Sequence, residues 1–130
     1  MTNEEKVEYW VDLSNNDLTV AETLLKNGHN LYAGFMCHQA VEKIFKGYYT
    51  KVNNNTPPFK HDLEYLAQQS GIYNLLNEKQ ILFLEKLNPL NIEARYPDYK
   101  NKTAQHLTNE RTQSIFEQTK ELVTWTKEKI

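Results

Sequence analysis

The stretch from Leu31 to Val52, LYAGFMCHQAVEKIFKGYYTKV, decides how this chain folds. An α-helix turns by about 100° per residue, so each residue can be assigned to a face. One face of this segment carries Gly34, Cys37, Val41, Ile44, Phe45 and Tyr48. The opposite face begins with Tyr32, Phe35 and Met36 and continues as Gln39, Glu42, Lys43 and Lys46. The pattern predicts a central helix whose later part lines a surface or groove, with the small Gly34 and Cys37 letting a neighbouring helix come close.

The segments on either side also have helical periodicity. Residues 3–27 carry one apolar stripe at spacings of three and four, closed by Asn27-Gly28. A loop is expected at 53–58, because Asn and Pro dominate there. Shorter helices are expected at about 61–70 and 77–87 and after Pro89, and a last long helix from about Thr108. The sequence therefore predicts an all-α fold, an up-and-down four-helix bundle with one or two extra short helices, as one domain over residues 1–130.

Composition narrows the class of protein. The chain has 130 residues, 15 basic and 17 acidic, for a net charge of −2, so it has no overall field that would attract nucleic acid. Its one cysteine, Cys37, excludes an internal disulfide and is expected to be an inert core thiol. The start is polar and no apolar run approaches the length of a membrane span. We expect a cytoplasmic protein with no membrane segment.

Few residues suggest chemistry by themselves. The four histidines have no metal-ligand spacing, so we expect neither a metal nor another cofactor. His38 is interpreted as a structural histidine, and His61, next to Asp62, as part of a helix cap. Gln39, Glu42, Lys43 and Lys46 project from one arc of the central helix. They could hold a phosphate, although a solvated face with Gln39–Lys43 and Glu42–Lys46 pairs is the simpler interpretation.

The segment from Asn88 to Lys100 is the densest in specific residue types. It contains Arg95, one of two arginines in the chain, between Glu93 and the two tyrosines Tyr96 and Tyr99. An arginine there can clamp a phosphate in bidentate fashion or stack on a base. It can also form an ion pair with Glu93 or Asp98 that pins the loop to the bundle. The sequence alone leaves these two interpretations open.

Four motifs in order resemble the HEPN domain, a nucleotide-binding domain found in higher eukaryotes and prokaryotes. They are Ala21 to Leu25 (AETLL), Cys37 to Lys46 (CHQAVEKIFK), Lys60 to Leu63 (KHDL) and Ile92 to Tyr99 (IEARYPDY). The resemblance covers about residues 8–128. It implies a helical bundle, often a homodimer, that in prokaryotes is commonly paired with a minimal nucleotidyltransferase in a toxin–antitoxin-like system.

Many HEPN proteins are also metal-independent ribonucleases in which an arginine is followed after four to six residues by a histidine. Here ten residues lie between Arg95 and His106, and no histidine follows Arg111. The leading hypothesis is therefore a non-catalytic module that binds a nucleotide, RNA or another phosphate-bearing ligand and acts with a nucleotidyltransferase.

The contact residues predicted by matching the motifs are Lys43, Lys46, Arg95, Tyr96 and Lys100. The alternatives are an endoribonuclease toxin using Arg95 and His106, and a purely structural adaptor. Tyr96 or Tyr99 could also accept a nucleotide from the partner enzyme.

Overall fold

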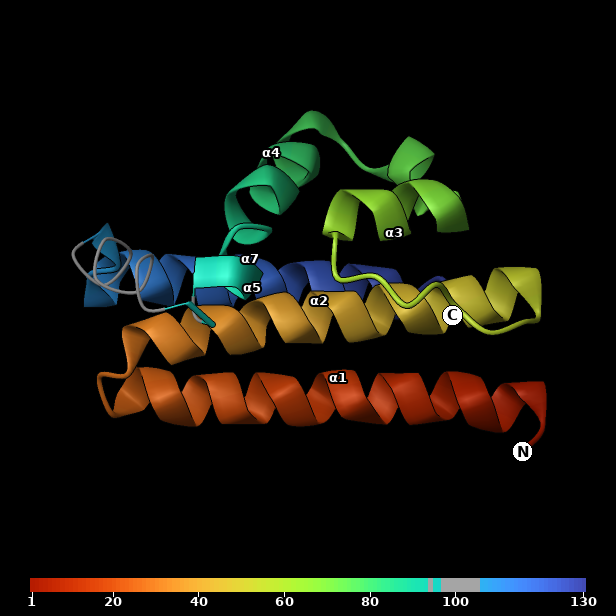
Figure 1. The fold of residues 1–130 in the computed structure, drawn as a ribbon, viewed down its shortest axis with the longest axis horizontal. Helices are drawn as coiled ribbons and strands as arrows, with labels where there is room; N and C mark the ends of the chain where they lie inside the picture. Colours follow the sequence, from red (N-terminus) through yellow and green to blue (C-terminus); the bar gives the residue numbers. More distant parts are fainter. Residues whose placement is uncertain (94, 97–105) are drawn as a thin grey trace.

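Three long helices lie side by side, and a layer of short helices covers two of them, on the side away from the first helix (Figure 1). The computed structural model describes residues 1–93, 95–96 and 106–130. The long helices are α1 (Asn3–Lys26), α2 (Asn30–Asn53) and α7 (Asn109–Lys127). The covering layer consists of α3 (Leu63–Ser70), the 3-10 helix η1 (Ile72–Leu75), α4 (Glu78–Leu87) and α5 (Leu90–Glu93). The described residues contain no strand, and the predicted all-α bundle is confirmed.

Capping residues explain where the helices begin and end. Thr2 and Glu5 form a reciprocal capping box at the start of α1, and Asn77 and Gln80 form another at the start of α4. The Asp62 carboxylate caps α3 by accepting hydrogen bonds from two backbone N–H groups in its first turn. The prediction that His61 is part of this cap is wrong, because the His61 ring contacts Glu42 of α2 instead. Gly71 ends α3 with a φ of 86°, a left-handed conformation that glycine adopts without strain.

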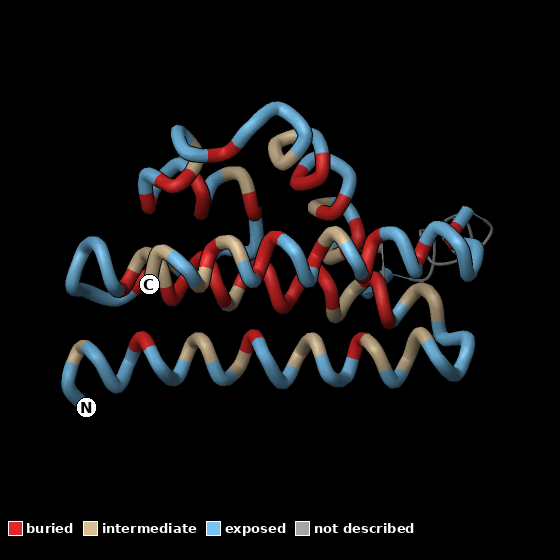
Figure 2. The backbone as a smooth tube through the Cα atoms, turned by 180° about the vertical axis from the view of Figure 1, so that it is seen from behind, coloured by how far each residue is buried: buried red, intermediate tan, exposed pale blue. Residues whose placement is uncertain are grey.

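Helices α1 and α2 run antiparallel and approach closely along a seam of short side chains. The seam residues are seven positions apart on each helix: Val7, Ser14 and Ala21 on α1, and Ala33, Ala40 and Gly47 on α2. The Ser14 hydroxyl donates to the Ala40 carbonyl at 2.7 Å. A Cβ atom at Gly47 would lie only 3.2 Å from the Trp10 Cβ. Figure 2 shows the regular spacing of the buried positions along α1, while α2 is buried over most of its length.

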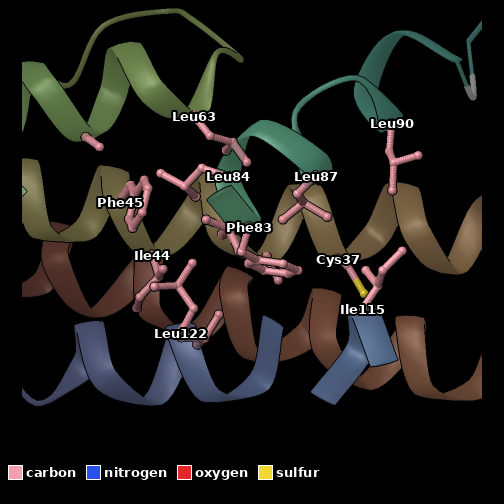
Figure 3. Packing of buried hydrophobic residues seen from close by; sticks show 14 of the residues in the cluster. Cys37, Ile44, Phe45, Leu63, Phe83, Leu84, Leu87, Leu90, Ile115 and Leu122 are labelled. Carbon is pink, nitrogen blue, oxygen red and sulfur yellow. The ribbon is translucent and has the colours of Figure 1, made fainter. Parts of the chain in front are cut away.

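The apolar core lies between α2, α7 and the covering layer (Figure 3). Phe45 and Ile44 of α2 meet Leu84 of α4 and Leu122 of α7 in one cluster of buried side chains. Gly34 lets a neighbouring helix come close to α2, because a Cβ at this position would lie only 2.9 Å from the Leu90 Cδ1 of α5. The missing side chain thus lets α5 pack directly on α2, which confirms the expected close approach.

Truncating Leu84 tests whether the covering layer belongs to the same core. Leu84 is fully buried, so Leu84→Ala is expected to lower the free energy of unfolding by about 2–5 kcal/mol through lost burial and a residual cavity. Urea denaturation followed by circular dichroism measures this value. Leu82→Ala, on the same helix but 57% exposed, is the matched control and is expected to change stability by less than about 0.5 kcal/mol. Equal effects of the two substitutions would contradict the packing of α4 described here.

Candidate functional site

A chain of hydrogen bonds crosses the face of α2 that points away from α7. The Lys43 ammonium contacts an Asp17 carboxylate oxygen on α1 and the Gln39 side-chain oxygen, each at 3.2 Å. The Gln39 amide nitrogen lies 3.3 Å from the Asn91 side-chain oxygen on α5. These side chains tie α1, α2 and α5 together. Burial raises the pKa of Asp17, and the neighbouring Lys43 opposes that shift.

Glu42 is the most deeply buried acid on this face, with 2% of the residue exposed. One of its carboxylate oxygens lies 3.2 Å from the Lys46 ammonium, and the other lies 2.9 Å from the His61 Nδ1. Lys46 is 7% exposed, and its ammonium lies 5.6 Å from the centre of the Trp10 ring. Both carboxylate oxygens and the ammonium are therefore partnered, as buried charges require.

The polar arc of α2, defined as Gln39, Glu42, Lys43 and Lys46, differs in one respect from the simpler expectation. The Gln39–Lys43 and Glu42–Lys46 pairs are both present. The expected solvated face is wrong, because Trp10 of α1 and His61 of the loop before α3 contact the arc. These contacts join residues far apart in the sequence, so helical periodicity cannot reveal them.

His38 directly precedes Gln39, the first residue of the arc, and is fully buried. Its Nδ1 is 3.4 Å from the Gln39 amide nitrogen, and its Nε2 makes no well-formed hydrogen bond within the described residues. Burial lowers the pKa of His38 to about 4, although Glu42, the Asn88 side chain and the His61 backbone partly oppose the shift. His38 is therefore a neutral structural histidine at neutral pH. Burial likewise raises the pKa of the Cys37 thiol to about 12, as an inert core thiol requires.

Arg95 and Tyr96 lie at the edge of this face, just beyond α5, and both are exposed. The guanidinium carbon of Arg95 lies over the Phe35 ring, 5.4 Å from its centre, and Phe35 precedes Gln39 by one turn of α2. Among the side chains that the structure describes, no carboxylate forms an ion pair with Arg95. The two acids that the sequence offers as its partners, the Glu93 side chain and Asp98, lie outside the described part of the structure. The exposed Arg95 cation lies against an aromatic ring. Lys100 and Tyr99 lie outside the described residues.

His106 is exposed at the start of the last described segment. Its backbone carbonyl accepts a hydrogen bond of 2.9 Å from the Arg111 guanidinium, so the second arginine helps to order the chain before α7. Within the described residues, no hydrogen bond joins Arg95 to His106. The pairing of these two side chains remains a prediction.

Three partners of the site escaped the sequence interpretation: Asp17, Asn88 and Asn91. The Asn88 side chain accepts from the Leu63 backbone N–H and donates to Asp62, so it joins the start of α3 to the end of α4. Asp17 and Asn91 complete the chain of hydrogen bonds across α2. In the sequence, the only signal for these three partners was that polar residues stand at the edges of apolar stripes. Most solvent-exposed positions share that pattern, so it does not single them out.

No group of three or more His, Cys, Asp or Glu side chains in residues 1–93, 95–96 and 106–130 is arranged to hold a metal ion. None of the helices described above is long and apolar enough to cross a membrane.

Comparison with known proteins gives the family. The sequence model of the HEPN domain matches residues 7–130. The chain belongs to the HEPN family. The fold of this HEPN domain is similar to the crystal structure of TT1696 from Thermus thermophilus, with a TM-score of 0.78 at 20% sequence identity over 96% of this chain and 98% of the other. No protein of curated function matches the sequence.

The buried His38 predicts that this HEPN domain loses stability in acid. The unfolded chain takes up a proton near the ordinary histidine pKa of about 6.5, whereas the folded chain resists protonation down to about 4. Stability should therefore fall as the pH drops through this window, by roughly 3 kcal/mol in total from this group. Urea denaturation at a series of pH values measures the slope.

Two variants separate His38 from the other titrating groups. His38→Gln should flatten the slope between about pH 6.5 and 4, and His29→Gln, which changes an exposed histidine, should leave it as in the wild type. A His38→Gln protein with the full wild-type slope would show that His38 does not control it.

The pairing of Glu42 gives a second stability prediction. Glu42→Gln keeps the side-chain size but leaves the buried Lys46 ammonium without its counter-charge, so the free energy of unfolding should fall by about 3–5 kcal/mol. Glu22→Gln is the matched control, because it breaks the exposed i,i+4 pair with Lys26 and should cost less than about 0.5 kcal/mol. Thermal and urea denaturation give both values. Similar losses for Glu42→Gln and Glu22→Gln would refute a buried, paired Glu42.

Proposed function

We propose that this HEPN domain binds a nucleotide or another phosphate-bearing ligand beside α5 and acts with a nucleotidyltransferase partner in a toxin–antitoxin-like pair. The observation that supports the proposal is the Arg95 guanidinium, which is exposed and lies 5.4 Å from the centre of the Phe35 ring. An exposed guanidinium can present its N–H groups to a phosphate. Tyr96 supplies an exposed aromatic ring next to it, on which a base can stack.

The lysines contribute to different degrees in this proposal. Lys43 is partly exposed and two turns along α2 from Phe35, about 12 Å by helical rise, so its charge lies within reach of an extended ligand. Lys46 is predicted from sequence as a contact, and its ammonium already pairs with Glu42 inside the bundle. We therefore assign the main phosphate contact to Arg95, the stacking contact to Tyr96 and a peripheral charge to Lys43. Lys100, four residues after Tyr96, remains a predicted contact.

Self-association fits the same side of the molecule. Three exposed side chains lie at or beside the proposed ligand site at Arg95. They are Tyr32 on α2, Ile92 on α5 and Tyr96 just after α5, which are 43%, 51% and 56% exposed. We propose that a second copy of the chain covers these apolar groups as a homodimer, which would bring two Arg95 side chains near one another. Pairing with a nucleotidyltransferase rests on family membership, and Tyr96 is then the exposed hydroxyl available as a nucleotide acceptor.

Nucleotide titration tests the role of Arg95. We expect ATP to bind the wild-type protein and Arg95→Ala to weaken binding by about tenfold or more, because a charge-assisted bidentate contact is lost. Arg95→Lys should recover only part of the affinity, since an ammonium cannot make the bidentate contact. Isothermal titration calorimetry measures the affinities. Lys6→Ala removes an exposed positive charge near the start of α1 and should leave binding unchanged.

The proposal fails if wild-type protein binds neither ATP nor a short single-stranded RNA, or if Arg95→Ala binds as well as wild type. Cleavage of the RNA in the presence of a chelator, abolished by His106→Ala, would favour the endoribonuclease instead. Circular dichroism of each variant separates loss of binding from loss of fold.

A further inference from the structure

A second surface lies around Trp125, away from the proposed ligand site at Arg95. Trp125 is on α7, which packs behind α2 in the view of Figure 1. One hollow beside this ring is lined by Tyr48, Lys51, Val52, Leu75, Trp125 and Lys129, from α2, η1 and α7 and the residues that follow α7. We name this hollow the Trp125 groove. A second hollow, between α4 and α7, shares Trp125 but has the acidic Glu121 in its lining and is not part of the groove.

The floor of the groove is apolar and accessible. Val52 and Leu75 are each 54% exposed, and Trp125 is half-buried between them and α4. These exposed aliphatic side chains, grouped beside an aromatic ring in one hollow, offer an apolar surface to a binding partner.

The charge of the groove near Leu75 is positive. Lys51 and Lys129 line it, no acidic residue does, and neither lysine forms an ion pair with any described residue. The Lys129 ammonium lies 4.1 Å from the centre of the Trp125 ring, which holds one of the two charges at the edge of the apolar floor. This edge is therefore complementary to a carboxylate that follows an apolar group.

We propose that the Trp125 groove docks a peptide segment of a partner protein in which an aliphatic or aromatic side chain adjoins acidic residues. The apolar side chain packs against Leu75, Val52 and Trp125, and the acidic residues pair with Lys51 and Lys129. A nucleotide fits less well, because the Lys129 ammonium already covers a face of the Trp125 ring on which a base would stack. The groove is independent of Arg95, so this inference stands apart from the proposed function.

Peptide display on the native protein tests the groove without a known partner. A random dodecamer library is selected on the wild-type protein, with counter-selection on the Lys51→Glu/Lys129→Glu variant. We expect enriched peptides that place Asp or Glu next to Leu, Phe or Trp. A synthetic, fluorescein-labelled copy of the best peptide should bind the wild type at least about tenfold more tightly than the double variant in fluorescence polarisation.

Further variants separate the groove from general surface charge. Lys6→Glu/Lys86→Glu makes the same change of net charge on exposed positions of α1 and α4 and should leave peptide binding within about twofold of wild type. Leu75→Ser, at a more than half-exposed position, should weaken binding without unfolding the protein. The proposal is overturned if no peptide is enriched, if enriched peptides lack acidic residues, or if the Lys51→Glu/Lys129→Glu variant binds as the wild type does.

Discussion

The Glu42 carboxylate is almost fully buried among the helices. Because a buried carboxylate needs partners, the groups that pair with it constrain much of the surrounding structure. Lys46 on the next turn and His61 from the loop before α3 both contact it, so the loop and the central helix are held in one arrangement. The Trp10 ring of α1 lies 5.6 Å from the Lys46 ammonium. This contact is possible because the short side chains of the α1–α2 seam let α1 come close to α2. A buried ion pair adds little net stability over apolar residues, but breaking one is costly, so it favours one arrangement over its competitors.

This arrangement separates buried, paired charges from the exposed charge of Arg95. Lys46 is paired inside the bundle, and Lys43 is shared between Asp17 and Gln39. Arg95 differs because it is exposed and its guanidinium lies over an aromatic ring, Phe35. Family membership gives the HEPN fold, whereas the proposed ligand contact at Arg95 and Tyr96 rests on the exposure of these two side chains. The proposed docking surface at the Trp125 groove, on α2, η1 and α7, is separate from them.

Local features were predictable from the sequence, and long-range partners were not. The helices expected over 3–27 and 61–70 are found at Asn3–Lys26 and Leu63–Ser70, because periodicity and capping act within a few residues. The arc on α2 was also visible as a pattern. Its burial was not, because it depends on Trp10 and His61, which reach it only through the tertiary fold. The role of Asn88, which bonds Leu63 and Asp62, was hidden for the same reason.

Side-chain NMR during an ATP titration tests the central claim most directly, because it observes the lysine and arginine nitrogens themselves. We predict that the Arg95 guanidinium and Phe35 ring signals shift as ATP binds, while the Lys46 ammonium signal and its contact with Glu42 stay unchanged. A shift of Lys46 with loss of that contact, and an unchanged Arg95, would contradict the division between paired structural charge and ligand-binding charge on which the account depends.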